Sequence, residues 1–291
     1  MPQPVKRGTV VEEGFRLDGI AAVTGAGQGI GLGIAGALAE RGVEVLALIL
    51  EDSQRDAVYE RVSGTSGKVE VQLLDVTDIG DFQFPSTLQV LVNNAGVRIS
   101  SRPIEVIDEA EWRRTFDVNF FGTVAMTRLA LPIMRAAQRG VICNISSGSL
   151  FSPIPFLGPY RASKAAVSAF SETLRVEVAP FGIRVIEILP GAVKTGINVN
   201  SILNVIADTT DEPAYLPMAE IQRAQAAGNP ADTKSPDEVG RYIVDAIYDA
   251  GGPQRYGGDS SSQELLERWR TSTDEERAAH ILTSYEAIIP R

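Results

Sequence analysis

The chain has 291 residues, of which 44% are hydrophobic and 22% charged, and its formal net charge is −10. This composition is typical of a globular protein that buries a full core. The excess of carboxylates argues against nucleic acid or an anionic membrane surface as a partner. One cysteine, Cys143, and one histidine, His280, leave too few ligands for a zinc site and no internal disulfide. We therefore expect a cytoplasmic protein without a structural metal.

The chain reads as one domain. Residues 1–14 have no apolar stretch of the kind found in signal peptides, and we expect a flexible extension there. The longest apolar run, residues 45–50, is too short to span a bilayer, so we expect no membrane insertion. No linker divides residues 15–262, which we assign to a single domain, and residues 263–291 are expected to form a helical tail of one helix or more.

A glycine-rich turn follows the first predicted strand, residues 20–23. Gly25, Gly29 and Gly31 have no side chain that would bar the backbone from a pyrophosphate. The helix predicted for residues 30–41 would direct its free N–H groups at the phosphates. Gly33 and Gly36 inside that helix predict unusually close packing.

Further strands and helices follow in alternation. Strands are predicted at residues 43–50, 69–73, 89–92, 141–145 and 183–189, with an edge strand at 255–256. Only 18 positions separate Asp75 from Asn93 (93 − 75), so we expect a helix of one or two turns there. Longer helices are predicted at residues 105–115, 118–138, 160–179 and 235–249. Residues 196–235 show no clear periodicity.

Tyr160 and Lys164 carry the strongest chemical signal. They stand at i and i+4 of a predicted helix and therefore share one face. A nearby ammonium and a helix N-terminus both lower the pKa of a phenol, which is about 10 in isolation. Tyr160 is therefore a candidate general acid/base.

Several further motifs accompany this pair in one order. They are Thr24-Gly25-Ala26-Gly27-Gln28-Gly29-Ile30-Gly31, Asp75, Asn93-Asn94-Ala95-Gly96, Asn119, Ser147 and Pro190-Gly191. Over about residues 15–200 the sequence resembles the short-chain dehydrogenase/reductase family, in its single-domain branch. The resemblance implies a doubly wound α/β fold, a Rossmann fold of three layers. Its parallel sheet would have the order 3-2-1-4-5-6, followed by a seventh strand.

The resemblance also implies a reaction and roles. The reaction would be reversible hydride transfer between a nicotinamide cofactor and a secondary alcohol or ketone. Tyr160 would be the acid/base, Lys164 would lower its pKa and bind the nicotinamide ribose, Ser147 would hold the substrate oxygen, and Asn119 would complete a proton relay. The cofactor contacts would come from Gly25, Gln28, Gly29, Ile30, Gly31, Asp75, Val76, Asn94, Ala95, Gly96, Tyr160, Lys164, Pro190, Gly191, Val193 and Thr195. Asp75 can equally be a turn-forming residue.

The cofactor preference is less clearly marked. Relatives that prefer NAD carry an aspartate where this chain has Ile49, and relatives that prefer NADP carry a basic residue where it has Gln28 or Leu50. Glu51 and Asp52 would repel a 2′-phosphate. We therefore expect NAD, with NADP not excluded.

The resemblance places residues 150–157 and a lid of residues 196–235 at the substrate mouth. The first segment is rich in large apolar side chains and the second contributes Ile197, Ile202, Leu203, Val205 and Ile206. This favours a bulky apolar alcohol or ketone, although the same side chains could instead pack on the core or on a neighbouring subunit. A homo-oligomer, a tetramer or dimer, is expected through the helices that begin near Val118 and Tyr160.

Two other classes of function remain open. One is a dinucleotide-sensing regulator on the same fold, because a fold does not fix a function. The other is an epimerase or dehydratase, although such relatives usually carry a differently spaced glycine motif. Intact Ser147, Tyr160 and Lys164 favour the dehydrogenase over the sensor.

Overall fold

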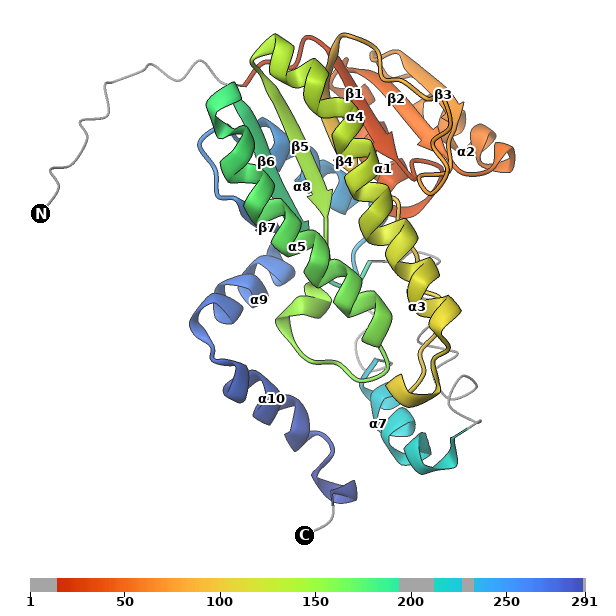
Figure 1. Cartoon of the computed structure of the whole chain (residues 1–291), viewed down its shortest axis with the longest axis vertical. Coiled ribbons are helices and arrows are strands. Elements are labelled where there is room, and N and C mark those ends of the chain that lie inside the picture. Colours follow the sequence, from red (N-terminus) through yellow and green to blue (C-terminus); the bar gives the residue numbers. More distant parts are fainter. Residues whose placement is uncertain (1–14, 194–211, 227–232, 290–291) are drawn as a thin grey trace, which may run out of the picture.

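Seven parallel strands form one sheet in the order β3-β2-β1-β4-β5-β6-β7, as expected (Figure 1). The computed structural model describes residues 15–193, 212–226 and 233–289. The strands are β1 Ile20–Thr24, β2 Glu44–Ile49, β3 Val69–Leu73, β4 Leu88–Asn93, β5 Gly140–Ile145, β6 Ile183–Leu189 and β7 Arg255–Gly257. The order reverses between β1 and β4, and ligands bind at the carboxyl ends of the strands near such a reversal.

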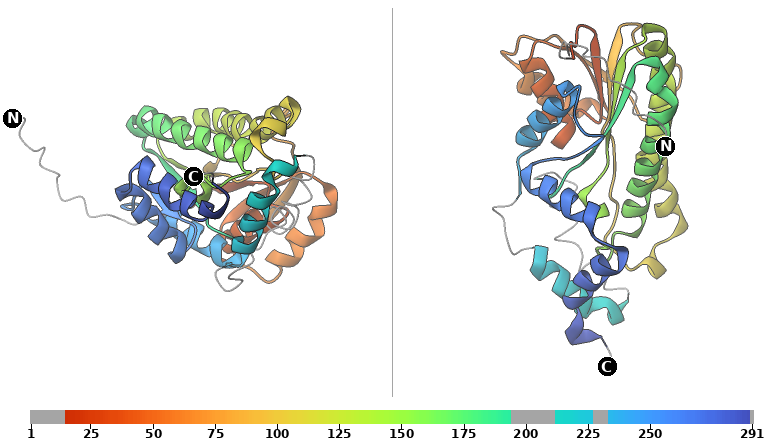
Figure 2. Two further views of the ribbon diagram at one scale, coloured as in Figure 1. Left: turned by 90° about the horizontal axis from the view of Figure 1, so that it is seen from below. Right: turned by 90° about the vertical axis from the view of Figure 1, so that its left-hand side faces the viewer.

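Helices cover both faces of the sheet and make a three-layer molecule (Figure 2). One face carries α1 Gly29–Glu40, α2 Arg55–Val62 and α8 Pro236–Tyr248, and the other carries α4 Gly122–Ala137 and α5 Gly158–Val178. α3 Glu109–Phe116 leads into α4. Beyond the carboxyl ends of the strands lie α7 Leu216–Ala226, α9 Ser260–Thr271 and α10 Asp274–Thr283.

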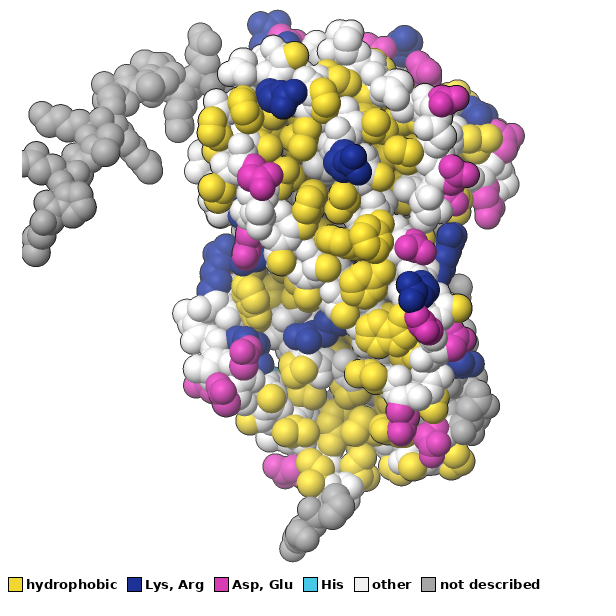
Figure 3. Space-filling model, viewed as in Figure 1, with side chains coloured by type: hydrophobic (Ala, Val, Ile, Leu, Met, Phe, Trp, Pro, Cys, Tyr) yellow, Lys and Arg dark blue, Asp and Glu magenta, His cyan; other side chains and the backbone are white. Residues whose placement is uncertain are grey.

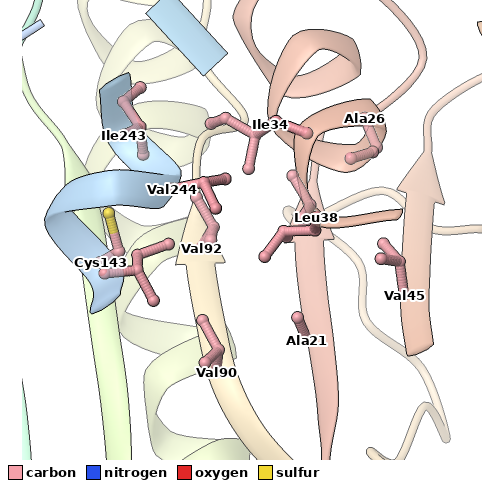
Figure 4. Packing of buried hydrophobic residues seen from close by; sticks show 14 of the residues in the cluster. Ala21, Ala26, Ile34, Leu38, Val45, Val90, Val92, Cys143, Ile243 and Val244 are labelled. Atoms are coloured by element: carbon pink, nitrogen blue, oxygen red, sulfur yellow. The ribbon is translucent and has the colours of Figure 1, made fainter. Parts of the chain in front are cut away.

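The core consists of two apolar layers, one on each face of the sheet. In the first, Ile34 and Leu38 of α1 and Ile243 of α8 pack on the strands and are fully buried (Figure 4). In the second, Met126 of α4 and Leu174 of α5 pack on the opposite face. Because β2, β4 and β5 are covered on both sides, nearly all of their residues are buried and their sequences are mostly apolar rather than alternating.

The predicted close packing of α1 is confirmed. A Cβ atom at Gly33 would lie 2.2 Å from the carbonyl oxygen of Pro236, at the start of α8. A Cβ atom at Gly240 would lie 2.3 Å from the carbonyl carbon of Gly33. Only glycine therefore allows α1 and α8 to approach so closely on this face of the sheet.

Two element predictions are corrected, and one helix was not predicted. No helix connects β3 to β4: this stretch is made of turns, and Phe82 and Phe84 pack edge to face into the core. The helix expected from residue 105 begins at Glu109, where the Asp108 side chain accepts a hydrogen bond from the Glu111 amide. α2 was not predicted, because Val58 is its one buried residue and its sequence shows little apolar periodicity.

The C-terminal segment packs against the domain. α9 begins at Ser260 rather than at residue 263, and Asp259 caps it with a side-chain oxygen. Leu266 is fully buried with Leu150 and Phe151, and Trp269 packs against the same cluster. Among the described residues, no helix combines the length and apolar character that crossing a bilayer needs. The N-terminal residues 1–14 lie outside the described residues.

Candidate active site

The glycine-rich loop joins β1 to α1 in the conformation that a phosphate cradle requires. Gly25 and Gly29 have φ angles of +63° and +54°, values that L side chains rarely adopt. A Cβ atom at Gly31 would lie 2.2 Å from the carbonyl oxygen of Gly25, so this glycine allows the loop to fold against the helix. Gln28 precedes α1 without capping it through its side chain. The first N–H groups of α1 can therefore bind an anion such as a pyrophosphate.

The Asn-Asn-Ala-Gly turn after β4 holds this loop in place. Asn94 Nδ2 donates to the carbonyl oxygens of Thr24 and Gly25 at 2.9 and 3.2 Å. The Thr24 hydroxyl accepts from the amides of Asn94 and Ala95, both at 3.0 Å. Asn93 is buried and donates to Asn144 of the neighbouring strand at 2.8 Å. The turn therefore positions the cofactor loop by its own hydrogen bonds.

Asp75 lies on the same cavity, at the end of β3, and is also the turn-forming residue that the sequence allowed. Its carboxylate accepts from the Thr77 amide at 2.9 Å and from the Thr77 hydroxyl at 2.7 Å. Burial raises its pKa, but these hydrogen bonds and the Arg114 charge outweigh burial and hold the pKa below its usual value. Asp75 is thus a fixed carboxylate beside the guanidinium of Arg114.

The carboxylates expected to select NAD do not line the cavity. Glu51 and Asp52 are bound within their own turn: Glu51 accepts from Ser53, and Asp52 pairs with Arg55 at 2.9 Å. Leu50 and Gln54 line the cavity at this point instead. The side chain of Ile49, at the position of the usual determinant, is fully buried.

Tyr160 and Ser147 meet at the carboxyl end of β5. Gly158 and Pro159 form the first positions of α5, which places Tyr160 in its first turn. The Tyr160 hydroxyl hydrogen-bonds to Ser147, whose Oγ also accepts from the Ser149 amide at 3.1 Å. This serine begins a single 3-10 turn, η4 Gly148–Phe151, which fixes it at the sheet edge. The pair forms a site that can hold one carbonyl or hydroxyl oxygen.

The pKa of Tyr160 is shifted in the opposite direction to the lowering that the sequence predicted. Burial raises the pKa, while the hydrogen bond from Ser147 and the positive charge of Arg98 lower it. The expected lowering by Lys164 is not among these effects. The net direction is upward, so the phenol of the protein alone holds its proton at neutral pH.

Lys164 lies behind Tyr160 and is almost fully buried. Its Nζ donates to the Ile145 carbonyl at 2.8 Å and lies 5.9 Å from the centre of the Tyr160 ring. Burial lowers the pKa of this ammonium to about 8, against the opposing effect of the Glu187 charge. Burial therefore disfavours the charged form of Lys164, and a buried side chain with a shifted pKa is common at functional sites.

Asn119 lies in a π-helical turn, η3 Asp117–Phe121, between α3 and α4. Its side chain accepts from the Val97 amide at 2.7 Å and donates to the Val97 carbonyl at 3.0 Å and to Ser163 at 2.9 Å. The backbone carbonyl oxygen of Asn119 accepts a hydrogen bond from the Thr123 hydroxyl at 2.9 Å. A π turn is often found at functional sites. Here the amide clamps the backbone after the Asn-Asn-Ala-Gly turn, and its part in a proton relay stays a prediction.

One cavity of about 840 Å³ joins these groups. Two expected residues, Gly31 and Asn119, are not among the residues that line it, and Thr195 lies outside the described residues. The remaining predicted residues all line it, namely Gly25, Gln28, Gly29, Ile30, Asp75, Val76, Asn94, Ala95, Gly96, Ser147, Tyr160, Lys164, Pro190, Gly191 and Val193.

The apolar segment 150–157 serves both of the uses that its sequence left open. Leu150 packs against α9, and Phe156 packs against Tyr215 and the rest of its cluster at α7. Phe151, Ile154 and Leu157 line the cavity. The lid residues named from the sequence lie outside the described residues, whereas α7 accounts for part of the expected lid segment.

Arg98 and Leu265 are among the cavity residues that sequence reasoning did not identify. Arg98, two positions after Gly96, lines it near Tyr160, and Leu265 of α9 lines it from the C-terminal segment. Arg98 follows the glycine turn directly and could have been noticed for that reason. Nothing in the sequence placed Leu265 at the site, because α9 reaches it only through tertiary packing.

Comparison with known proteins agrees with this geometry. The family model described as short chain dehydrogenase matches residues 19–206. The uncharacterized oxidoreductase YusZ of Bacillus subtilis is 34% identical over 79% of this chain and 83% of its own length. The 11-beta-hydroxysteroid dehydrogenase A of Sesamum indicum is 36% identical over 79% of this chain and 68% of its own. A short chain dehydrogenase from Burkholderia cenocepacia, solved in complex with NADP, shares the fold with a TM-score of 0.66 and 24% identity, covering 94% and 98% of the two chains.

The sheet reversal, the glycine cradle and the serine–tyrosine–lysine arrangement define a nicotinamide-dependent oxidoreductase. The chain belongs to the short-chain dehydrogenase family.

Proposed function

We propose that the protein transfers a hydride between a nicotinamide cofactor and a secondary alcohol or ketone with a bulky apolar body. The observation that carries this proposal is the Ser147–Tyr160 pair at the wall of the cavity that the glycine-rich loop opens onto. When bound, the cofactor supplies or accepts the hydride. The residues present suit such a group, because the glycine cradle and the first turn of α1 offer backbone N–H groups to a pyrophosphate.

The protein side of the reaction is proton transfer and placement. In reduction, Tyr160 gives its proton to the carbonyl oxygen as that oxygen gains charge, and Ser147 holds the same oxygen by a hydrogen bond. In oxidation, Tyr160 must first lose its proton. Lys164 supplies a fixed positive charge beside the phenol. Asn119 links the loop of Val97 to the first turn of α5 by hydrogen bonds to the Val97 amide and to Ser163.

The apolar wall supports the substrate class. Phe151, Ile154, Leu157 and Leu265 line the cavity around the serine and tyrosine. An apolar substrate gains about 25 cal/mol for each Å² it removes from water against such a wall. The name of the Sesamum indicum relative, a hydroxysteroid dehydrogenase, points to substrates of the same class.

NAD is the proposed cofactor, although the reason is no longer the negative charge of Glu51 and Asp52 on which the sequence analysis relied. Leu50 and Gln54, rather than Glu51 and Asp52, face the cavity at the end of β2, and neither carries the positive charge that a 2′-phosphate requires. We also propose a homo-oligomer in the cytoplasm. The sensor and the epimerase or dehydratase receive no support from the relatives reported above.

A substrate panel tests the proposal. Cyclic and aryl ketones, a polyol and their reduced or oxidised partners are each incubated with NADH, NADPH or the oxidised forms, and the absorbance of the reduced nicotinamide is followed. We expect turnover of the cyclic ketones, with a higher kcat/KM for NADH than for NADPH. Preference for the polyol would contradict the substrate class, and preference for NADPH would contradict the cofactor. The absence of any turnover would contradict the function itself.

A further inference from the structure

Glu187 is a buried carboxylate that the proposed reaction does not use. It lies on β6, in a strand that is otherwise apolar apart from Arg184, and it is 0% exposed. Arg255 Nε of β7 donates to its Oε2 at 2.7 Å, whereas its Oε1 has no hydrogen-bond partner among the described residues. Burying a carboxylate opposes folding, and an apolar pair in place of a buried ion pair is often at least as stable. The fold alone therefore does not account for this charge.

The carboxylate faces α5 one turn after Lys164. Lys164 and Ser168 share the buried face of α5, four positions apart, and the Ser168 hydroxyl donates to Glu187 Oε2 at 3.2 Å. Glu187 is also the register partner of Asn144 on β5, and Lys164 Nζ donates to the carbonyl of the next β5 residue, Ile145, at 2.8 Å. The carboxylate and the ammonium are therefore neighbours in the layer between the sheet and this helix.

The other charges around this pair are bound elsewhere. Among the residues that the structure describes, the titratable and charged side chains that face it are Tyr160, Glu172 and Arg175 on α5, Arg255 on β7 and Arg270 on α9. Glu172 pairs with Arg255, while Arg175 and Arg270 donate to backbone carbonyls of the β7 segment. Burial lowers the pKa of Lys164 to about 8, and the effect that opposes burial comes from the Glu187 charge.

We propose that Glu187 is a positioning residue of the active site, whose buried negative charge keeps Lys164 in its charged form at neutral pH. This inference rests on the proposed function, in which Lys164 supplies a fixed positive charge beside Tyr160. Burial alone favours the neutral amine, which would not stabilise the oxygen that gains charge during ketone reduction. Because Arg255 holds the carboxylate, the support of the active site extends to β7, at the edge of the sheet.

The test measures the pKa of Lys164 directly, by carbon NMR of the full-length protein labelled at the Cε atoms of its lysines. Loss of one signal in Lys164→Met identifies Lys164 among the other lysines, which are Lys6, Lys68, Lys194 and Lys234. We expect a wild-type midpoint near pH 8. Glu187→Gln keeps the shape of the side chain and removes its charge, so the midpoint should fall by roughly one unit or more.

Glu172→Gln is the matched control, because Glu172 pairs with the same arginine but its side chain is 55% exposed. This variant should move the midpoint clearly less. A midpoint that stays in place in Glu187→Gln, or that moves equally in both variants, would overturn the inference. If Glu187→Gln does not fold, the double variant Glu187→Met/Arg255→Met replaces the ion pair by apolar side chains that a core tolerates. Its midpoint should also fall, since Arg255 is not among the groups that shift the pKa of Lys164, and a midpoint that stays in place would again overturn the inference.

Activity tests separately whether the reaction uses this charge. The kcat/KM for reduction of a cyclic ketone is followed across pH in wild type and in Glu187→Gln. Its decline at high pH should begin at lower pH in the variant, by the shift that NMR gives for Lys164. A decline that stays in place would contradict a role of Glu187 in the reaction. The NMR titration needs neither cofactor nor turnover, so a lowered midpoint in a protein that reduces no ketone would support the effect of Glu187 on Lys164 and contradict the proposed function alone.

Discussion

At the scale of single residues, the site depends on how its neighbours set the protonation of Tyr160. Burial favours the neutral phenol, whereas Ser147 and Arg98 favour the phenolate. Alcohol oxidation needs the phenolate, so its kcat/KM should rise with pH until Tyr160 is deprotonated. Ketone reduction needs the neutral phenol and should fall over the same range.

Ser147→Ala tests the balance around the phenol. The substitution removes a hydrogen bond that lowers the pKa of Tyr160, so the midpoint of the pH profile for alcohol oxidation should move to higher pH. The rate at saturating pH should also drop roughly 10- to 100-fold, because the substrate oxygen loses a donor. Ser146→Ala is the control, since Ser146 Oγ instead donates to the Lys164 carbonyl at 3.3 Å. A midpoint that stays in place or moves to lower pH would contradict the assigned role.

Lys164→Met should stabilise the fold while impairing activity. The pKa of Lys164 is about 8 in the folded protein against 10.5 in the unfolded chain, so the unfolded chain binds more protons between these values and stability rises with pH across that window. Below pH 8 the ammonium is charged in both states and its desolvation opposes folding in full. At pH 7 we expect a gain on the order of 1–3 kcal/mol, part of it offset by the lost hydrogen bond to Ile145.

Chemical denaturation at pH 7 measures this change in the free energy of unfolding. Lys68→Met serves as the control, because Lys68 is an exposed lysine paired with Glu44 on the surface and its removal should change stability little. A Lys164→Met variant that is less stable than wild type at pH 7 would show that the buried ammonium supports the fold.

At the scale of elements, the C-terminal helix α9 completes the wall of the cavity. The chain just before α9 packs closely on the loop after β6, because a Cβ atom at Gly258 would lie 2.6 Å from Pro190 Cα. Leu266 is buried beneath it while Leu265, one position earlier, lines the cavity and is 42% exposed. α9 is thus part of the active site and not an appendage.

Leu265→Arg should lower kcat/KM for a cyclic apolar ketone roughly tenfold or more, because a charge on this wall must lose water when the substrate binds. Leu282→Arg is the matched control: Leu282 is also an exposed leucine of the C-terminal segment, 53% exposed on α10, and does not line the cavity. Affinity for the cofactor should stay the same in both variants. Equal rates for Leu265→Arg and wild type would remove α9 from the substrate wall.

The same elements show what the sequence could predict. The strands were found because β2, β4 and β5 are buried on both faces and their sequences are therefore mostly apolar. The serine, tyrosine and lysine were found because helical spacing and motif order link them. α2 escaped notice because one buried residue, Val58, leaves almost no pattern. The helix before β4 was wrongly predicted because the packing of Phe82 and Phe84 replaces it. Leu265 joins the site through tertiary contacts that no local spacing records, whereas the position of Arg98 two residues after Gly96 was a signal that was overlooked.

At the scale of the whole molecule, one face carries many exposed apolar side chains. Apolar side chains gather along the surface that α4 and α5 present in Figure 3. Val176 of α5 is 75% exposed, and Phe121 of η3 is 55% exposed. Exposed apolar area of this extent commonly marks a contact surface. This is the surface that the sequence analysis assigned to subunit contacts.

We therefore expect light scattering at micromolar concentration to give a mass two or four times the 31.2 kDa of one chain. Val176→Asp and Phe121→Asp should shift the mass toward that of the single chain, because a carboxylate in a contact must be desolvated. Leu73→Asp, at a leucine that is 49% exposed on the edge strand β3, should leave the mass unchanged. A wild-type mass of one chain would contradict the expected oligomer.

The central claim is that Tyr160 exchanges the proton that accompanies hydride transfer. The most direct test is the steady-state reduction of a cyclic ketone by wild type and by Tyr160→Phe, with cofactor affinity measured alongside by calorimetry. Removing one hydroxyl from an otherwise unchanged ring should lower kcat by roughly 10²- to 10⁴-fold and leave cofactor affinity nearly intact. A variant that keeps more than about a tenth of the wild-type rate would contradict the role given to Tyr160.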